Sequence, residues 1–330
     1  MIPPGLAYIA DNIITKGNLL GAAKGRGAEW AKDLNLPKQG ETIFFAGCGH
    51  QYASELESLS SLIRRIDKSA VGTDVAFGLA NFQKKVGIDV TRLYSRVTAA
   101  KGNPGAEPLR DAVKVLSRLG IKFAYLAEDE PCCGGPLHYM GLHQQFTQQT
   151  QKAYDRFKSK GVKRIISLVP SCTYTLRQLM ANNVQNYDLE VKHFVEVVAE
   201  NLSSLTLRFP REVKVTYHDP CQLVRFLNLT EEPRRILKAI KGVELVEPEW
   251  TKGAYATCCG GGGGFEAVFP ELSEILAVNR AKELLATGAE IIVTPCPGCI
   301  MQLKAGLKEL KASNVAVLDM TQIVAMSMEG

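Results

Sequence analysis

Three cysteine motifs, YHDPC at 217–221, ATCCGGGGG at 256–264 and TPCPGC at 294–299, decide how the second half of this chain folds. A short apolar run precedes each motif, at residues 213–217, 243–246 and 291–294. Runs of this length, rich in β-branched residues and bounded by Gly and Pro, predict buried strands. The sequence therefore places every cysteine of this region just after a strand or in the loop that follows one.

Helical patterns separate these strands. One covers residues 234–240, and a longer one opens at Pro270 and closes at Gly288. The residues predicted to form the apolar side of the longer helix are Leu272, Ile275, Leu276 and Leu284. Strands that alternate with helices predict an α/β protein with parallel sheets, in which the loops after the strands gather at the carboxyl edge.

The same order of elements occurs earlier in the chain. Predicted strands at 42–46, 121–126 and 162–169 precede Cys48, the pair Cys132 and Cys133, and Cys172, with helices at 108–119 and 141–160. The vicinal pair and the next cysteine are 39 residues apart in the first half and 37 in the second. We expect two pseudo-repeated Rossmann-like halves, with the cysteine loops converging at the carboxyl ends of the strands.

The domain prediction has three parts: an N-terminal arm at 1–40 that Trp30 anchors, a first domain at 41–206 and a second at 207–330. The first domain contains a basic insertion at about 60–106, because Cys48 and Cys132 are 84 residues apart against 37 in the second half. The insertion carries eight Lys or Arg against three Asp. It is a candidate for docking a partner or substrate, and a solvated charged face is the alternative.

Composition narrows the functional classes. The chain of 330 residues is 46% apolar and 22% charged, which is typical of a globular protein, and its net charge of +5 is too small to predict a nucleic-acid partner. It contains no apolar run of the roughly 20 residues that a transmembrane helix needs. No targeting signal follows Met1. We expect a cytoplasmic location, with peripheral attachment to a membrane through a partner as the alternative.

The nine cysteines predict metal binding. Their number is odd, and adjacent cysteines do not readily form a disulfide with each other, so disulfides are a poor explanation. A structural zinc site takes four ligands, commonly two close pairs, and would leave one of the five thiolates after residue 220 unused. Two adjacent thiolates more naturally reach two metal atoms, which favours an iron–sulfur cluster. A zinc-stapled scaffold without redox function is the competing hypothesis.

Two further residue types accompany the cysteines. Gly260 and Gly261, with Gly134 in the first half, lack a Cβ and let the backbone approach a cluster, so they are predicted to bind the cofactor. His218 precedes Cys221 by three residues and has a suitable pKa for delivering a proton to a departing thiolate. The alternative for His218 is a structural hydrogen bond within the core.

These motifs resemble the CCG-domain family, which includes the catalytic B and D subunits of heterodisulfide reductases. The matching residues are GC at Cys48, E-x-CCGGP around Cys132, YHDPC, CCGGGGG and CPGC. The resemblance implies a noncubane four-iron cluster that attacks a disulfide directly. The predicted catalytic positions are Cys258 and Cys259, together with His218. The ligands that the resemblance implies for this cluster are Cys221, Cys258, Cys259, Cys296 and Cys299.

The first half departs from the family pattern, because Thr175 stands where a fifth cysteine is expected. Four thiolates suffice for a cubane, so the resemblance implies a second [4Fe-4S] cluster for electron relay, held by Cys48, Cys132, Cys133 and Cys172. His50 is an alternative ligand there.

The resemblance also implies partners and substrates. A ferredoxin-like iron–sulfur protein, of the kind that forms the C subunits of heterodisulfide reductases, and a flavin protein would exchange electrons with this chain. The substrate would be a disulfide, a thiol or a lipoyl-type group. The alternative function is electron transfer alone, in a complex of the lactate or glycolate oxidase type.

Overall fold

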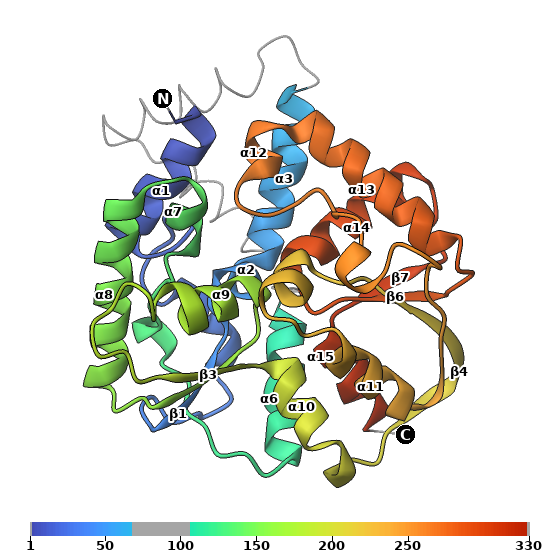
Figure 1. Cartoon of the computed structure of the whole chain (residues 1–330), viewed down its shortest axis with the longest axis horizontal. Helices are drawn as coiled ribbons and strands as arrows, with labels where there is room; N and C mark the ends of the chain where they lie inside the picture. The colour runs from blue at the N-terminus through green and yellow to red at the C-terminus, as the bar shows by residue number, and fades with distance from the viewer. Residues whose placement is uncertain (1, 68–105, 329–330) are drawn as a thin grey trace.

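Seven short strands form two parallel sheets in the computed structural model, which describes residues 2–67 and 106–328 (Figure 1). The first sheet has the order β1-β2-β3, with strands Thr42–Phe45, Arg164–Ser167 and Glu190–His193. The second has the order β5-β4-β6-β7, with β4 at Arg208–Tyr217, β5 at Lys241–Leu245, β6 at Ile291–Val293 and β7 at Ala316–Leu318. The predicted α/β class with two Rossmann-like halves is confirmed.

The predicted strand at 121–126 is wrong. This segment forms one isolated parallel bridge, between Ala124 and Ile43. The Ala124 backbone exchanges two hydrogen bonds with the β1 backbone, and the Tyr125 amide then donates to the carbonyl of Pro37 at 2.8 Å, which draws the chain away from the sheet. Because this bridge lies beside β1 as β5 lies beside β4, both halves follow the same strand order.

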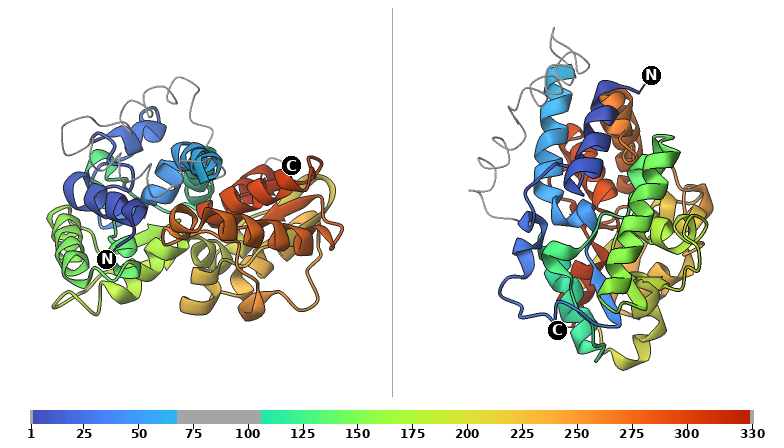
Figure 2. Two further views of the ribbon diagram at one scale, coloured as in Figure 1. Left: turned by 90° about the horizontal axis from the view of Figure 1, so that it is seen from above. Right: turned by 90° about the vertical axis from the view of Figure 1, so that its left-hand side faces the viewer.

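Helices connect and cover the strands of both halves. In the first half they are α2 (Gly47–Gln51), α3 (Ala53–Asp67), α6 (Glu107–Arg118), α7 (Gly135–Tyr139), α8 (His143–Ser159), α9 (Pro170–Tyr174) and α10 (Phe194–Glu200). In the second they are α11 (Glu231–Ala239), α12 (Phe265–Val268), α13 (Pro270–Leu285), α14 (Pro297–Glu309) and α15 (Met320–Ser327). Helix α3 packs against α12, α13 and α14, so it ties the first half to the second (Figure 2).

Helix α13 buries a different face from the one that its apolar residues predict. Leu272 and Ile275 are 47% and 49% exposed, although Leu284 is buried as predicted. The buried positions are Pro270, Ser273, Ala277, Arg280, Ala281 and Leu284. Small residues on this face let α14 approach closely, since a Cβ on Gly306 would lie 2.5 Å from the carbonyl oxygen of Ala277. Close helix packing, and not apolar area alone, therefore sets the rotation of α13.

The N-terminal arm is more regular than predicted. It contains the 13-residue helix α1 (Pro4–Lys16) and a 3₁₀ turn, η1 (Arg26–Ala31). Trp30 is 3% exposed, and its Nε1 donates to the Tyr125 hydroxyl at 3.0 Å while its ring packs on Phe44. The predicted anchoring of the arm by Trp30 therefore agrees with the structure.

The division into domains stays a prediction. The sheets change between β3 and β4, close to the predicted boundary at 206 and 207. However, one hydrophobic core extends from Phe44 in the first half to Val215 and Ile323 in the second. The basic insertion predicted at about 60–106 lies mostly outside the described residues. Within the described ranges, no helix combines the length and hydrophobicity that crossing a membrane requires.

Replacing Trp30 with Ala should lower the free energy of unfolding by about 3–5 kcal/mol, because it empties a buried aromatic site and removes the hydrogen bond to Tyr125. Urea unfolding followed by circular dichroism measures this change. Trp250, which is 79% exposed, provides the matched control. Trp250→Ala should change the unfolding free energy by no more than about 0.5 kcal/mol, and an equal loss in both variants would contradict the anchoring role.

Candidate metal centre

Four cysteines of the first half meet beyond the carboxyl ends of β1 and β2. Cys48 lies in α2 and Cys172 in α9, and the Sγ atoms of Cys133 and Cys172 are 3.4 Å apart. Cys132 forms side-chain hydrogen bonds with both Cys133 and Cys48. We call these four residues the first cysteine set: Cys48, Cys132, Cys133 and Cys172.

Five cysteines of the second half meet in the same way beyond β4, β5 and β6. The Sγ atoms of Cys259 and Cys299 are 3.2 Å apart, and Cys299 also forms a hydrogen bond with Cys296. Cys221 interacts electrostatically with Cys296 and Cys259, and Cys258 with Cys221. We call these residues the second cysteine set: Cys221, Cys258, Cys259, Cys296 and Cys299. Every cysteine of both sets is a free thiol, in agreement with the argument against disulfides.

The two sets differ in their exposure. Cys258 is exposed, whereas Cys259 and Cys299 are 3% and 4% exposed. In the first set, Cys48 is partly exposed and the other three thiols are buried. Cys258 is therefore the most exposed member of the second set.

Glycines shape both sites. The backbone N–H of Gly260 donates to Cys258 Sγ at 3.3 Å, and a Cβ at this position, where φ is +84°, would overlap the carbonyl oxygen of Ser273. A Cβ on Gly261 would lie 2.8 Å from Gln302. Only glycine fits this turn without displacing α13 or α14.

The glycines of the first half have different roles. Gly134 packs against Gln149, whereas a Cβ on Gly135 would lie 2.5 Å from Thr175 Oγ1 and 3.6 Å from Cys133 Sγ. Gly135 therefore lines the first cysteine set more closely than the predicted Gly134 does. Apart from its place in the CCGGP motif, nothing in the sequence predicts that Gly135 lies at this site.

In each set the electrostatics favour the thiolate, the form in which cysteine binds metal, at one central cysteine. They raise the pKa of its neighbours, which are Cys132 and Cys172 in the first set and Cys221, Cys258 and Cys299 in the second. Hydrogen bonds with Cys258 and Cys299, and then the nearby His218, hold the pKa of the Cys259 thiol well below its usual range. Hydrogen bonds with Cys132 and Cys172 likewise hold the pKa of the Cys133 thiol well below its usual range. A group of buried thiols on glycine-rich turns has the donor chemistry that an iron–sulfur cluster requires.

The two sets face each other across the contact between the halves. A Cβ on Gly49, next to Cys48, would lie 2.8 Å from Pro297, next to Cys296. The Tyr139 hydroxyl, six residues after Cys133, donates to Gln222 Oε1 at 3.2 Å, and Gln222 follows Cys221. The protein therefore brings both cysteine sets to one central region.

Thr175 lies at the first cysteine set. It is fully buried, its hydroxyl donates to the Ser171 carbonyl at 2.8 Å, and it interacts with Cys133 beside Gly135. A hydroxyl thus stands beside the thiols of the first set at the position of the missing fifth cysteine.

Glu130 is a site residue to which the sequence alone assigned no role. Its carboxylate accepts hydrogen bonds from the backbone amides of Ala46 and Gly47, both at 2.9 Å, and from Gln51 Nε2 at 2.8 Å. It therefore fastens the loop of Cys48 to the loop of Cys132. The E-x-CCGGP motif contains this residue, and the corresponding position in the second half is Ala256.

Asp219 holds the corresponding loop in the second half. Its two carboxylate oxygens accept hydrogen bonds from Arg234, both at 2.9 Å, and one of them also accepts from the Gly253 amide at 2.8 Å. None of these hydrogen bonds involves a cysteine of the second set. His50 is buried, its Nε2 lies 3.6 Å from Asp319 Oδ2, and burial lowers its pKa to about 3, so its ring is neutral and the contact with Asp319 is not an ion pair.

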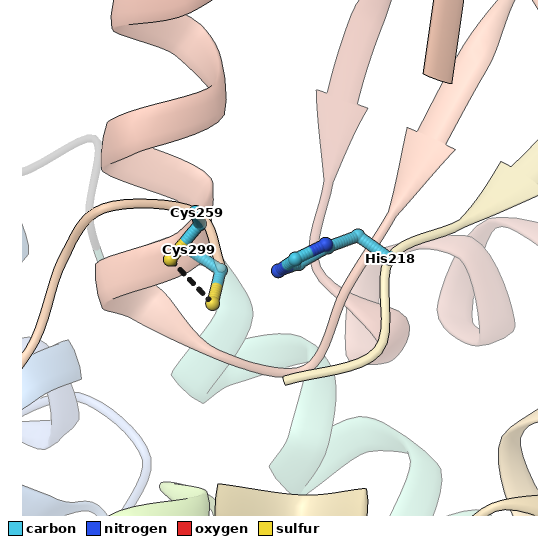
Figure 3. Close-up of side chains that lie close together, drawn as sticks. All are labelled: His218, Cys259 and Cys299. Atoms are coloured by element: carbon cyan, nitrogen blue, oxygen red, sulfur yellow. Dashed lines mark hydrogen bonds between the residues drawn. The ribbon is translucent and has the colours of Figure 1, made fainter. Parts of the chain in front are cut away.

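His218 points at the second cysteine set. It is 1% exposed, and one of its ring nitrogens lies within 4.8 Å of the Sγ atoms of Cys259 and Cys299 (Figure 3). Its Nδ1 accepts a hydrogen bond from Arg280 Nε at 3.0 Å. Arg280 is fully buried in α13, and no sequence motif predicted its presence at the site.

Two cysteine sets at the carboxyl edges of two parallel sheets define an α/β protein of the thiolate-rich metal-binding class. The chain belongs to the cysteine-rich CCG domain family, whose pattern matches residues 98–177 and 215–304. The two matched segments contain every cysteine of both sets except Cys48.

Several relatives are iron–sulfur or oxidoreductase proteins. The D subunit of the dihydromethanophenazine:CoB–CoM heterodisulfide reductase of Methanosarcina barkeri is 31% identical over 64% of this chain and 53% of its own length. The EtfAB:quinone oxidoreductase of Syntrophomonas wolfei is 32% identical over 66% of this chain and 31% of its own length. The B subunit of the fumarate reductase (CoM/CoB) of Methanothermobacter marburgensis is 28% identical over 65% and 42%. The chain thus spans about half the length of these relatives, or less.

The fold also resembles a solved structure. A hypothetical protein from Helicobacter pylori superposes with a TM-score of 0.52 at 15% identity, over 68% of this chain and 46% of that protein. This likeness concerns the fold alone. The family and its iron–sulfur relatives support iron–sulfur clusters as the cofactor of this chain.

Proposed function

We propose that this chain is the iron–sulfur component of a heterodisulfide-reductase-like complex that reduces or forms a disulfide. The reacting site is the second cysteine set, and the first set relays electrons. The observation that carries the proposal is the convergence of five thiols on one site whose vicinal pair is divided between a buried and an exposed member, Cys259 and Cys258. A noncubane four-iron cluster in this set would supply one-electron steps and an iron atom able to accept sulfur.

The protein's own residues prepare this site. Cys259 and Cys299 are buried and hold the cofactor from the protein side, while the exposed Cys258 marks the face that a disulfide can approach. The Gly260 amide supports Cys258 with a hydrogen bond. Reduction of a disulfide consumes two electrons and two protons and yields two thiols.

The electrons for this reaction would come from a separate ferredoxin-like protein, which would in turn exchange electrons with a flavin protein. The relatives are themselves subunits of reductase complexes, which supports a need for partners. The first cysteine set, buried except at Cys48 and adjacent to the second set through Gly49 and Pro297, is placed to pass electrons between such a partner and the second set.

Metal analysis of protein purified without oxygen tests the cofactor. We expect about eight irons with matching acid-labile sulfide per chain, which corresponds to two four-iron clusters. Reduced viologen dye should then drive reduction of a disulfide, with a coenzyme heterodisulfide, a persulfide and a lipoyl amide as the three substrates compared. Stoichiometric zinc without sulfide would overturn the proposal, and iron–sulfur protein inactive on all three would restrict it to electron relay.

Electron relay alone is the second candidate, because the relatives include an EtfAB:quinone oxidoreductase. In that case both sets would only carry electrons, as in the lactate or glycolate oxidase type of complex. Dye-driven turnover of disulfide or thiol separates the two functions.

Replacing Thr175 with Cys should change the type of the first cluster. The new thiol would stand beside Cys133 and complete a five-cysteine set like that of the second half. Mössbauer spectra of ⁵⁷Fe-labelled protein should then show the two clusters becoming alike, with the iron content unchanged. Thr175→Ser, which keeps the hydroxyl, is the control, and a spectrum that the Cys variant leaves unaltered would contradict the cubane assignment of the first set.

A further inference from the structure

An arginine stands directly behind His218. Arg280 is fully buried, and its Nε donates to His218 Nδ1 at 3.0 Å. A guanidinium has only N–H donors and remains protonated, so Nδ1 must offer its lone pair to it. The ring proton of neutral His218 therefore resides on Nε2.

The second ring nitrogen faces sulfur. Nε2 of His218 is buried and has no hydrogen-bond partner within the described residues, sulfur atoms included. The ring points toward Cys259 and Cys299, whose Sγ atoms it approaches within 4.8 Å (Figure 3). A thiolate is an acceptor that this N–H faces across that distance.

We propose that Arg280 fixes the tautomer of His218, so that the proton on Nε2 is directed at the sulfur atoms of the second cysteine set. Arg280 is a positioning residue that acts through His218. The predicted effect on a cluster depends on the proposed function. A hydrogen bond to sulfur stabilises the more negative, reduced state of a cluster and so raises its reduction potential.

The same geometry excludes two other roles for His218. Binding metal through Nε2 would move the ring proton to Nδ1, so that two N–H donors, on Nδ1 and on Arg280 Nε, would point at each other. A doubly protonated ring would bring the same two donors together. Under this proposal His218 acts as a fixed hydrogen-bond donor, and the proton-delivery role predicted from the sequence is the alternative that the spectra described below test.

Arg280 is itself held firmly in place. Its Nη1 donates to the carbonyl oxygen of Thr251 at 2.9 Å, to the hydroxyls of Thr251 and Thr257 at 3.1 and 3.3 Å, and to Glu283 Oε2 at 2.6 Å. The carboxylate of Glu283 balances the buried charge. Flipping the His218 ring would place a carbon against Arg280 Nε and leave a buried donor unsatisfied.

Nuclear magnetic resonance tests the tautomer without any cluster. In the full chain, freed of metal and kept reduced, long-range ¹H–¹⁵N spectra of ¹⁵N-histidine report which ring nitrogen carries the proton, and His218→Gln identifies the signal among the five histidines. We expect the Nε2–H form in the natural protein and in Arg280→Lys, which retains a donor. Arg280→Met should populate both tautomers. An Nδ1–H or doubly protonated ring in the natural protein would overturn the proposal.

The reduction potential of the loaded second site gives the second readout. In a redox titration followed by electron paramagnetic resonance, Arg280→Met should shift the midpoint to more negative values, while Arg280→Lys should retain most of the natural value. Thr251→Val is the matched control, because it removes a contact of Arg280 but leaves His218 untouched. An equal shift in Thr251→Val would show a merely structural effect and overturn the role.

The two failures are distinguishable. Protein that holds no iron–sulfur cluster would refute the proposed function, whereas the nitrogen spectra would still decide the tautomer. If Arg280→Met does not fold, the spectra of the natural protein and of Arg280→Lys decide the inference by themselves.

Discussion

Cys259→Ala should lower the iron content from about eight to about four atoms per chain and reduce dye-driven disulfide turnover to background. Cys259 is buried in the centre of the second cysteine set, with its Sγ 3.2 Å from that of Cys299 and a hydrogen bond to Cys258. Its loss removes an inner thiolate that neither water nor a neighbouring side chain can replace. Iron, sulfide and turnover are measured on the same anaerobic preparation.

Cys133→Ala is the matched control in the first half. Cys133 occupies the corresponding place, 3.4 Å from Cys172 and equally buried, so its replacement should also remove about four irons. The second cluster and its spectrum should remain. If the two variants lost the same spectroscopic signal, or if Cys259→Ala kept all its iron, the separation into two sites would be wrong.

Glu130→Ala should lower the free energy of unfolding by about 3–5 kcal/mol and release the iron of the first site. The substitution leaves the amides of Ala46 and Gly47 and the side chain of Gln51 without their acceptor, and each unsatisfied buried group costs about 1–3 kcal/mol. The loop that carries Cys48 is then no longer fastened to the loop of Cys132. Urea unfolding and iron analysis measure the two effects separately.

Glu128 offers the control for Glu130. It is an exposed carboxylate two residues away that pairs with Lys38 at 3.1 Å, and such a pair contributes about 0–1 kcal/mol. Glu128→Ala should therefore leave both the stability and the iron content nearly unchanged. Glu130→Gln retains one acceptor oxygen and should give an intermediate loss of stability. A fully stable Glu130→Ala variant with its iron intact would show that Glu130 does not fasten the two loops.

The sequence by itself determined the class of fold and the composition of both cysteine sets. Strand runs such as 213–217 and 291–294 are short, β-branched and bounded by Pro, so local propensity identifies them. A cysteine after each strand must reach the carboxyl edge of a parallel sheet, whatever the details of packing. The regular spacing of the motifs therefore predicted both the α/β class and the two sites.

Only the tertiary structure decided which polar residues serve these sites. Leu272 and Ile275 made α13 look apolar on the face that proves to be exposed, and close packing against α14 turned Arg280 inward instead. Arg280 reaches His218 across 62 residues of sequence, and Glu130 reaches Gly47 across 83. Hydrophobic periodicity reports which residues avoid water, but a buried charge is stabilised by partners that are distant in the chain, so local sequence carries no sign of it.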